Sequence, residues 1–260
     1  MIQIENLSKV FRTSEVETIA LNHVNIEVKE GEFVAIMGPS GCGKSTLLNI
    51  LGLLDNPSEG SYKLIGKEVA NLKEKERTRL RKGVIGFVFQ SFNLIDELNV
   101  FENVELPLTY LGIKASERKE RVLEILKRMN LSHRAKHFPQ QLSGGQQQRV
   151  AIARAIVLQP KYLFCDEPNS GLDPLTSIVI DNLLSELTHE YDMTTVINTH
   201  DMNSVFEIGE KVLFIHEGHK EWEGSNEEIM YTNNKALNEF LFSSKLNRMV
   251  REKLGKKSEE

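Results

Sequence analysis

The chain has 260 residues, 40% of them hydrophobic, which is enough for one large α/β core or for a core with an inserted subdomain. Its 32 Lys and Arg residues against 37 Asp and Glu residues give a formal net charge of -5, which argues against a nucleic-acid partner. No apolar run approaches the roughly 20 residues that span a bilayer, and the first ten residues lack the features of a signal peptide. We therefore expect a cytoplasmic protein in which Cys42 and Cys165 are reduced.

Short β-rich runs alternate with turn signals through the first ninety residues, which predicts antiparallel strands around one buried strand, "FVAIM" at residues 33–37. Further along, the apolar strands "KYLFC" and "MTTVIN" alternate with helical stretches, a pattern typical of a mostly parallel sheet. Two amphipathic helices precede "KYLFC". Their apolar positions are Val122, Leu123, Leu126 and Met129 in the first helix, and Val150, Ala153, Ile156 and Val157 in the second.

The stretch "GPSGCGKST" lies between the buried strand and a helical run, and it fits the pattern of a glycine, four residues and Gly-Lys-Ser. Its glycines let several N–H groups point inward, and the following helix adds the positive end of its dipole. A glycine turn with a chance lysine is the alternative, which the strand and helix flanks disfavour. The predicted phosphate-binding residues are Gly38, Pro39, Ser40, Gly41, Cys42, Gly43, Lys44, Ser45 and Thr46. Among them, Lys44 is expected to reach the β- and γ-phosphates, and the Ser45 hydroxyl to bind Mg²⁺.

Two adjacent carboxylates, Asp166 and Glu167, follow the strand "KYLFC", at the edge where open α/β sheets bind ligands. Because Mg²⁺ takes few carboxylates and several waters, Asp166 is expected to hold the metal through water. Glu167 then remains free to orient and polarise an attacking water. An acidic pair after a strand is often only a turn or a helix cap, but the phosphate loop upstream favours a catalytic pair.

Three further residues are candidates for the same site. Gln90 ends the strand "VIGFVF", where its side-chain oxygen is expected to reach the metal and the water. His200 follows "TTVINT", where a neutral imidazole can hydrogen-bond a γ-phosphate oxygen or position the water. Phe11 is a candidate to stack on adenine, with an ordinary core phenylalanine as the alternative.

A second glycine-containing stretch, "QLSGGQQQRV", opens the second amphipathic helix. Ser143 and the amides of Gly144 and Gly145 crown the N-terminus of that helix and form another anion site. A triphosphate bound to the first loop has one side open, and a second anion site of this kind would cover that side. Spacing alone leaves open whether that second anion site comes from the same chain or from another.

Taken in order, these motifs and "SGLD" at residues 170–173 resemble the ATPase subunit of ABC transporters, over residues 1 to about 230. The resemblance implies an α/β P-loop NTPase (RecA-like) core with an antiparallel β subdomain and an inserted α-helical subdomain. It implies ATP and Mg²⁺ as cofactors, integral membrane permease subunits that dock near Gln90, and a homodimer that is peripheral on the inner face of the cytoplasmic membrane. In that head-to-tail dimer, the residues that act on the partner's ATP or link the two sites are Ser143, Gly144, Gly145, Gln146 and Ser170 to Asp173.

On this resemblance, residues 1–240 form the ATPase domain, with residues 1–90 and 159–230 as the nucleotide-binding core and residues 91–158 as the helical subdomain. Residues 241–260 are expected to be a C-terminal helical extension and tail. Its apolar positions among basic residues are Leu246, Met249, Val250 and Leu254. Such a segment suits docking on a partner subunit or anionic lipid, with a plain solvated helix as the alternative.

The two halves of the chain resemble different groups of these ATPases. Residues 1 to about 155 look like the lipoprotein-release (Lol) and MacB macrolide-export group. Residues from about 160 to 260, with "NSGLD" where the first group would have Thr-Gly-Asn-Leu-Asp, look like Mla-type phospholipid-transport ATPases. A natural mosaic, a divergent lineage and a constructed hybrid would each give two halves that resemble different groups. Because the groove for the membrane partner is built around Gln90, the front half favours a Lol or MacB-type partner.

Other classes of ATPase carry similar motifs. DNA-repair and chromosome ATPases place a coiled coil or zinc insert between the phosphate loop and the signature, and only about a hundred residues separate them here. Translation-factor relatives carry two such cassettes in one chain. A regulator that moves a membrane partner without transporting a substrate stays open, and neither the substrate nor the direction of transport is encoded in these motifs.

Overall fold

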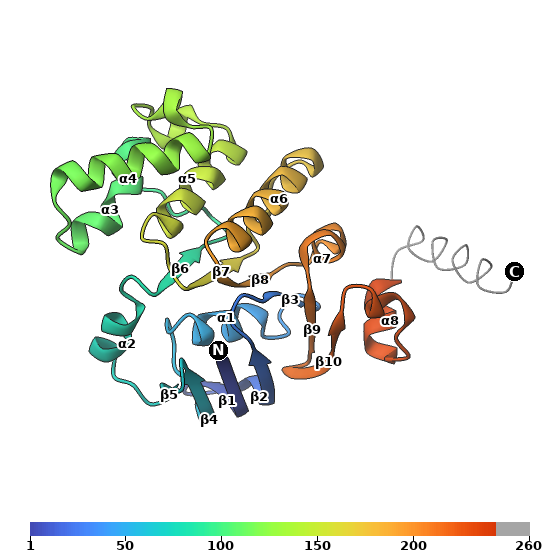
Figure 1. Ribbon diagram of the computed structural model, residues 1–260. Coiled ribbons are helices and arrows are strands. Elements are labelled where there is room, and N and C mark those ends of the chain that lie inside the picture. Colours follow the sequence, from blue (N-terminus) through green and yellow to red (C-terminus); the bar gives the residue numbers. More distant parts are fainter. Residues whose placement is uncertain (243–260) are drawn as a thin grey trace, which may run out of the picture.

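The computed structural model describes residues 1–242, and its centre is a mostly parallel sheet of six strands (Figure 1). The spatial order is β10-β9-β3-β8-β7-β6, with only β10 antiparallel to its neighbour. Its strands are β3 (Phe33–Met37), β6 (Ile85–Val88), β7 (Tyr162–Asp166), β8 (Thr194–Asn198), β9 (Lys211–His216) and β10 (His219–Ser225). Both faces of the parallel part are covered, as the continuous apolar strands predict.

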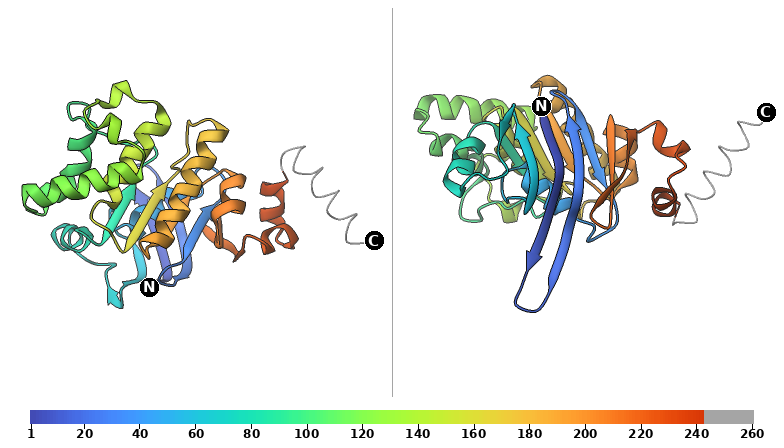
Figure 2. Two further views of the ribbon diagram at one scale, coloured as in Figure 1. Left: turned by 45° about the horizontal axis from the view of Figure 1, so that its top comes forward. Right: turned by 90° about the horizontal axis from the view of Figure 1, so that it is seen from below.

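A second, antiparallel sheet has the order β2-β1-β4-β5, and its long hairpin extends away from the body of the molecule (Figure 2). Its strands are β1 (Ile2–Arg12), β2 (Glu17–Val28), β4 (Glu59–Leu64) and β5 (Lys67–Glu68). Helix α1 (Lys44–Leu51) lies between the two sheets and shares one apolar core with both. The sequence-based expectation of an α/β P-loop core with an antiparallel β sheet is therefore confirmed.

The opposite face of the parallel sheet packs on helices in a separate apolar core. Alternation along β3 divides its residues between the two cores, because Phe33 and Ala35 face these helices while Val34 and Ile36 face α1. The helices over this face and beyond it are α3 (Val100–Tyr110), α4 (Ala115–Arg128), α5 (Gly144–Ile156), α6 (Pro174–Glu190) and α7 (Met202–Ile208). The remaining short elements are α2 (Glu74–Arg81), η1 (Ser132–Arg134), η2 (Pro139–Gln141), η3 (Glu228–Tyr231) and α8 (Lys235–Leu241).

One predicted core position in the amphipathic helix α4 is wrong. Leu123 is 44% exposed, whereas Val122, Leu126 and Met129 are buried against α3 and α5. At about 100° of rotation per residue, the buried positions Val122, Ile125, Leu126 and Met129 form one stripe, and Leu123 falls at the edge of that stripe and turns toward solvent.

No helix within residues 1–242 combines the length and apolar character required to cross a membrane. The residues predicted to dock the C-terminal extension, Leu246, Met249, Val250 and Leu254, lie outside the described part of the chain.

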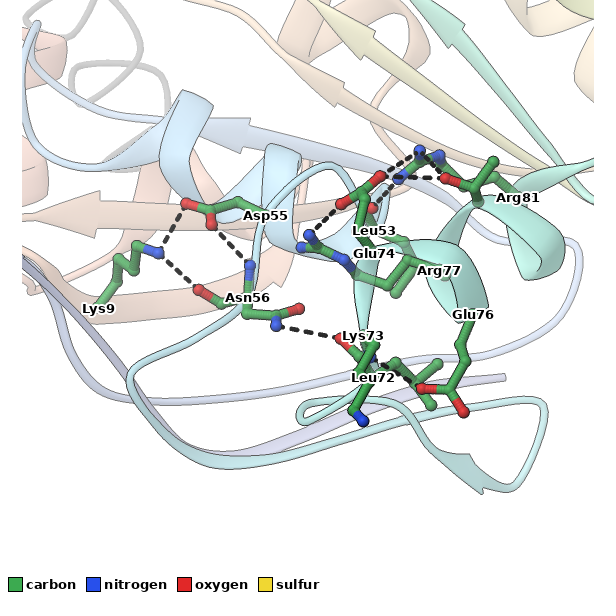
Figure 3. A network of polar contacts seen from close by, with 11 residues as sticks. Lys9, Leu53, Asp55, Asn56, Leu72, Lys73, Glu74, Glu76, Arg77 and Arg81 are labelled. Atoms are coloured by element: carbon green, nitrogen blue, oxygen red, sulfur yellow. Dashed lines mark hydrogen bonds and ion pairs between the residues drawn. The ribbon is translucent and has the colours of Figure 1, made fainter.

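A polar network ties the end of α1 to α2 and to β1 (Figure 3). The Arg81 guanidinium donates to the carbonyl of Leu53, just past α1, and also to Glu74 Oε1 at 3.1 Å and Thr78 Oγ1 at 3.0 Å. Leu53 is the second residue past α1, so Arg81 fixes the loop that leaves the helix and places its positive charge near the negative end of the helix dipole. Lys9 forms an ion pair with Asp55 at 2.7 Å and fixes the same loop from the other side.

We expect Arg81→Ala to lower the free energy of unfolding by about 1–2 kcal/mol, because hydrogen bonds from a charged donor are lost at a partly buried site. Urea unfolding followed by circular dichroism measures the change. Arg79→Ala is the matched control, since Arg79 is exposed on the same helix, and it should change stability by less than about 0.5 kcal/mol. Equal losses in the two variants would contradict the role given to Arg81.

Candidate functional site

The site lies where three neighbouring parallel strands end at the same level. Asp166 at the end of β7 pairs with Asn198 at the end of β8, and Asn198 pairs with Ile36 near the end of β3. The register continues one residue further, since the Glu167 amide donates to the Asn198 carbonyl at 3.0 Å and the Thr199 amide to the Ile36 carbonyl at 3.1 Å. The segments that leave the three strands therefore start side by side, as expected for a ligand-binding edge.

The loop at residues 38–46 joins β3 to α1 in a tight turn. Gly43 has a φ of 105°, and a Cβ there would lie 2.3 Å from the Ala20 carbonyl oxygen of β2, so only glycine fits. Lys44 is only 6% exposed, and its Nζ donates to the carbonyls of Gly38 at 2.9 Å and Pro39 at 3.0 Å. The loop therefore surrounds a charged amine with backbone oxygens and holds it at the start of α1.

Several amides of this loop have no acceptor. Within the described residues, no hydrogen bond is donated by the amides of Ser40, Gly41, Gly43, Lys44, Ser45 and Thr46. Unpaired amides gathered at a helix N-terminus form an anion site, and the residues present therefore fit the phosphates of a nucleotide. Cys42 differs from these residues, because its amide donates to the Pro39 carbonyl at 3.4 Å. Its side chain is buried, and burial raises the pKa of the thiol against the opposing effect of Lys44.

The oxygen ligands that suit Mg²⁺ also meet here. The Ser45 hydroxyl lies 3.1 Å from Asp166 Oδ1, and Asn198 Nδ2 donates to the same oxygen at 2.9 Å. Among the described residues, no three His, Cys, Asp or Glu side chains gather into a metal site of their own. This donor set fits Mg²⁺, which binds one or two protein oxygens and otherwise phosphate and water. Asn198 was missed by the sequence analysis, although it is the last residue of the predicted strand "MTTVIN".

Glu167 and His200 form a pair at the same edge. Glu167 Oε2 lies 3.3 Å from His200 Nδ1, the imidazole being mostly exposed and the carboxylate partly buried. Glu167 has a φ of 45°, the left-handed region that costs a residue with a side chain about 1 kcal/mol. Gln90 lies two residues beyond the end of β6, and its Nε2 donates to Ser170 Oγ at 3.0 Å. The structure thus brings Gln90 to the turn that follows Glu167.

Phe11 lies near the end of β1 and pairs with Thr18 of β2. Thr18 is two residues before Ala20, whose carbonyl lies against Gly43 of the loop at residues 38–46. The ring is 45% exposed, so the alternative of an ordinary core phenylalanine is wrong. The Lys9 ammonium lies 5.1 Å from the ring centroid. An exposed ring on the same strand pair that contacts the phosphate loop at Ala20 is available for stacking on a base.

The second glycine stretch begins α5. Ser143 is its N-cap: its hydroxyl accepts from the Gln146 amide at 3.4 Å, and Gln146 Oε1 accepts from the Ser143 amide at 3.1 Å. This capping box leaves the glycine amides at the tip. A Cβ on Gly145 would lie 2.5 Å from Thr176 Cγ2, so the glycine lets α5 approach α6 of the same chain.

The side chain of Asp173 forms its hydrogen bonds within the first turn of its own helix, α6. It is the N-cap of α6 and accepts from the Thr176 amide at 3.0 Å and from the Thr176 hydroxyl at 2.5 Å. These two hydrogen bonds lower the pKa of the Asp173 carboxyl. Thr176 therefore has a fixed rotamer, with its hydroxyl on Asp173 and its methyl group toward Gly145.

A parallel sheet with a glycine loop between β3 and α1, and acidic residues at the end of the next strand but one, defines a P-loop nucleotide-binding protein. A family model described as "ABC transporter" matches residues 21–170. The uncharacterized ABC transporter ATP-binding protein MJ0796 of Methanocaldococcus jannaschii is 47% identical over 86% of this chain and 96% of that protein. The dimeric structure of MJ0796 in a post-hydrolysis state bound to ADP and Pi has a TM-score of 0.81, with 45% identity over 87% of this chain and 99% of that one.

Two other relatives have more specific names. The methionine import ATP-binding protein MetN of Francisella tularensis is 44% identical over 84% of this chain and 62% of MetN. The macrolide export ATP-binding/permease protein MacB of Chlorobium luteolum is 44% identical over 84% of this chain, which spans 32% of MacB. The chain belongs to the ABC transporter family, as an ATP-binding cassette that hydrolyses ATP.

The contact between α5 and α6 makes a testable prediction. We expect Gly145→Ala to lower the free energy of unfolding by about 1–3 kcal/mol, because the new methyl group overlaps the Thr176 methyl, which cannot rotate away without breaking its bond to Asp173. Thermal unfolding measures the loss. The double variant with Thr176→Ser keeps the hydroxyl and removes the methyl, and it should recover most of the stability. A double variant no more stable than Gly145→Ala would contradict this packing.

Proposed function

We propose that the chain is the ATP-hydrolysing subunit of an ABC transporter and drives a membrane partner of the lipoprotein-release or macrolide-export type. The observation that carries the hydrolytic part is the meeting of three features at one sheet edge. These are the unpaired loop amides with Lys44, the Ser45–Asp166 oxygen pair, and the Glu167–His200 pair. Phosphates need the first feature, Mg²⁺ the second, and an attacking water the third.

In this proposal the loop amides and Lys44 bind and orient the phosphates, and Ser45, Asp166 and Gln90 face the metal. Bound Mg²⁺ would neutralise charge on the β- and γ-phosphate oxygens. Glu167 accepts a hydrogen bond from the attacking water and polarises it, while His200, 3.3 Å from the carboxylate, positions the water or the γ-phosphate. Phe11 stacks on the adenine, which the exposure of its ring supports.

The second glycine stretch completes the site of another copy in this proposal. Ser143, Gly144, Gly145 and Gln146 cover the partner's ATP from the open side of its phosphate loop, and the turn ending at Asp173 links the two sites. The capped N-terminus of α5 supports this role, because its glycine amides are directed outward from the tip. Both MJ0796 structures are described as dimeric, which supports a homodimer.

An apolar groove supports docking of a permease segment beside the helical subdomain, residues 91–158. The groove has a volume of about 350 Å³ and lies between the end of α1, β6, α2 and α3, with the 73%-exposed Tyr110 at its side. Its apolar lining includes Leu54, Ile85, Phe87, Pro107, Tyr110 and Leu111. A helix of the membrane partner fits such a surface, and it would hold the chain on the inner face of the cytoplasmic membrane.

The Mla-type phospholipid transporter is the second candidate, favoured by the "NSGLD" turn after Glu167. A regulator that moves a membrane partner without transport is a third, and MetN shows that importers also resemble this chain. Purification of the cognate membrane complex separates these functions. A permease with a large periplasmic domain would support the lipoprotein or macrolide type, a compact permease with a lipid-binding partner the Mla type, and absence of substrate release from membranes the regulator.

Glu167→Gln tests the catalytic role. The variant should bind ATP and form a stable dimer, with turnover at least about 100-fold lower, because an amide cannot act as the base for water. Phosphate release and size-exclusion chromatography with ATP measure the two effects. Glu221→Gln, at an exposed glutamate of β10, is the control and should keep normal turnover. Normal turnover in Glu167→Gln would rule out Glu167 as the base.

Lys44→Ala tests the phosphate loop. We expect nucleotide affinity to fall about tenfold to a hundredfold, because the charge-assisted bonds to the phosphates are lost. Titration with a fluorescent ATP analogue measures the affinity. Lys75→Ala, at an exposed lysine of α2, should leave it unchanged. Unchanged affinity in Lys44→Ala would count against the binding site.

A further inference from the structure

A buried carboxylate on α6 lies outside the residues given a role above. Asp181 is 2% exposed, and its two oxygens accept one hydrogen bond each. Asn169 Nδ2 donates to Oδ1 at 2.6 Å, and the Ser204 hydroxyl donates to Oδ2 at 2.7 Å. Asn169 Nδ2 also lies 3.3 Å from Ser204 Oγ, which closes a compact group of three side chains.

This group joins the two segments that carry the catalytic pair. Asn169 is two residues after Glu167, in the turn where the Ser170 amide donates to the Glu167 carbonyl. Ser204 is four residues after His200, in the first turn of α7. The direct Glu167–His200 contact at 3.3 Å completes a ring. One side of this ring is the catalytic pair and the other is Asp181.

Burying this carboxylate costs stability. In the part of the chain that the structure describes, Asp181 forms no ion pair, and its two donors are neutral side chains. Burial, together with the negative charges of Asp201 and Glu207, raises the pKa of Asp181 to about 6, against the opposing effect of the two hydrogen bonds. A core apolar residue would avoid this cost, so stability alone does not account for the group.

We propose that Asp181, with Asn169 and Ser204, is a positioning residue that fixes Glu167 relative to His200. The inference rests on the proposed function of that pair. Asp181 does not touch the nucleotide or the water in this proposal; it acts through the two segments that it joins. The group makes no hydrogen bond to residues 38–46, so nucleotide binding does not depend on it. Its loss should therefore slow the chemical step and leave affinity for ATP unchanged.

Asp181→Leu removes both acceptors while keeping a similar volume. We expect kcat to fall about tenfold or more with KM within twofold, because small displacements of catalytic groups cost large factors in rate. Asp181→Asn should keep kcat within about threefold. Its carbonyl oxygen accepts from Ser204, and its amide donates to Asn169 Oδ1, which is buried without a partner and faces Asp181 after the Asn169 amide turns over.

Steady-state ATPase assays, ATP-binding titrations and melting temperatures are measured on each variant of the full chain. Thr188→Val is the control, since Thr188 is equally buried on α6 and bonds to Thr195 away from the ring. Where Asp181→Leu fails to fold, Ser204→Ala removes one donor and should show the same loss in kcat alone.

Unchanged kcat in both Asp181→Leu and Ser204→Ala, with Glu167→Gln inactive, would overturn this inference and leave the proposed function standing. Equal losses of kcat in Asp181→Leu and Asp181→Asn, or in Thr188→Val, would also overturn it, since they would reflect general damage to α6. Full turnover in Glu167→Gln would instead overturn the proposed function itself.

Discussion

The site depends on the register of three parallel strands. Ile36 of β3, Asn198 of β8 and Asp166 of β7 lie side by side in the pairing of these strands. The segments that follow the three strands therefore leave the sheet together. A shift of one residue in β7 would direct Asp166 to the opposite face and separate it from Ser45. Hydrogen bonds from the Glu167 and Thr199 amides extend the pairing beyond the strands. The strand register therefore sets where the segments that carry Asp166, Glu167 and His200 leave the sheet.

The parts of this arrangement that local sequence determines were predictable. "FVAIM" is a buried strand because it is apolar throughout, and the glycine loop follows from its own backbone requirements, which Gly43 illustrates. The carboxyl-edge rule for parallel sheets then brought Asp166, Glu167 and His200 together without knowledge of any tertiary contact. Leu123 shows the limit of such patterns, because periodicity identifies an apolar face but not the width that neighbouring helices cover.

Contacts between segments far apart in the chain could not be predicted in this way. Asn169 and Ser204 are polar residues of ordinary types, and nothing in their neighbours marks them as partners of Asp181. The same holds for Arg154 of α5, which donates to the carbonyls of Phe92 and Asn93 in the left-handed turn after Gln90. Each of these contacts requires the three-dimensional packing of two helices or of a helix and a loop, so only the structure reveals it.

The position of Glu167 depends both on backbone pairing within the sheet and on side-chain contacts between distant segments. Its φ of 45° is unfavourable for a residue with a Cβ, and such a conformation persists only where the surroundings over-determine it. Here the Glu167 amide is fixed on Asn198, its carbonyl accepts from Ser170, and the turn is attached through Asn169 to α6. The strain lies in the main chain, so exchanging the carboxylate for an amide leaves the turn as it is. The chemistry of the side chain and the geometry of the turn are therefore separable, the first residing in Glu167 and the second in the contacts that hold its backbone.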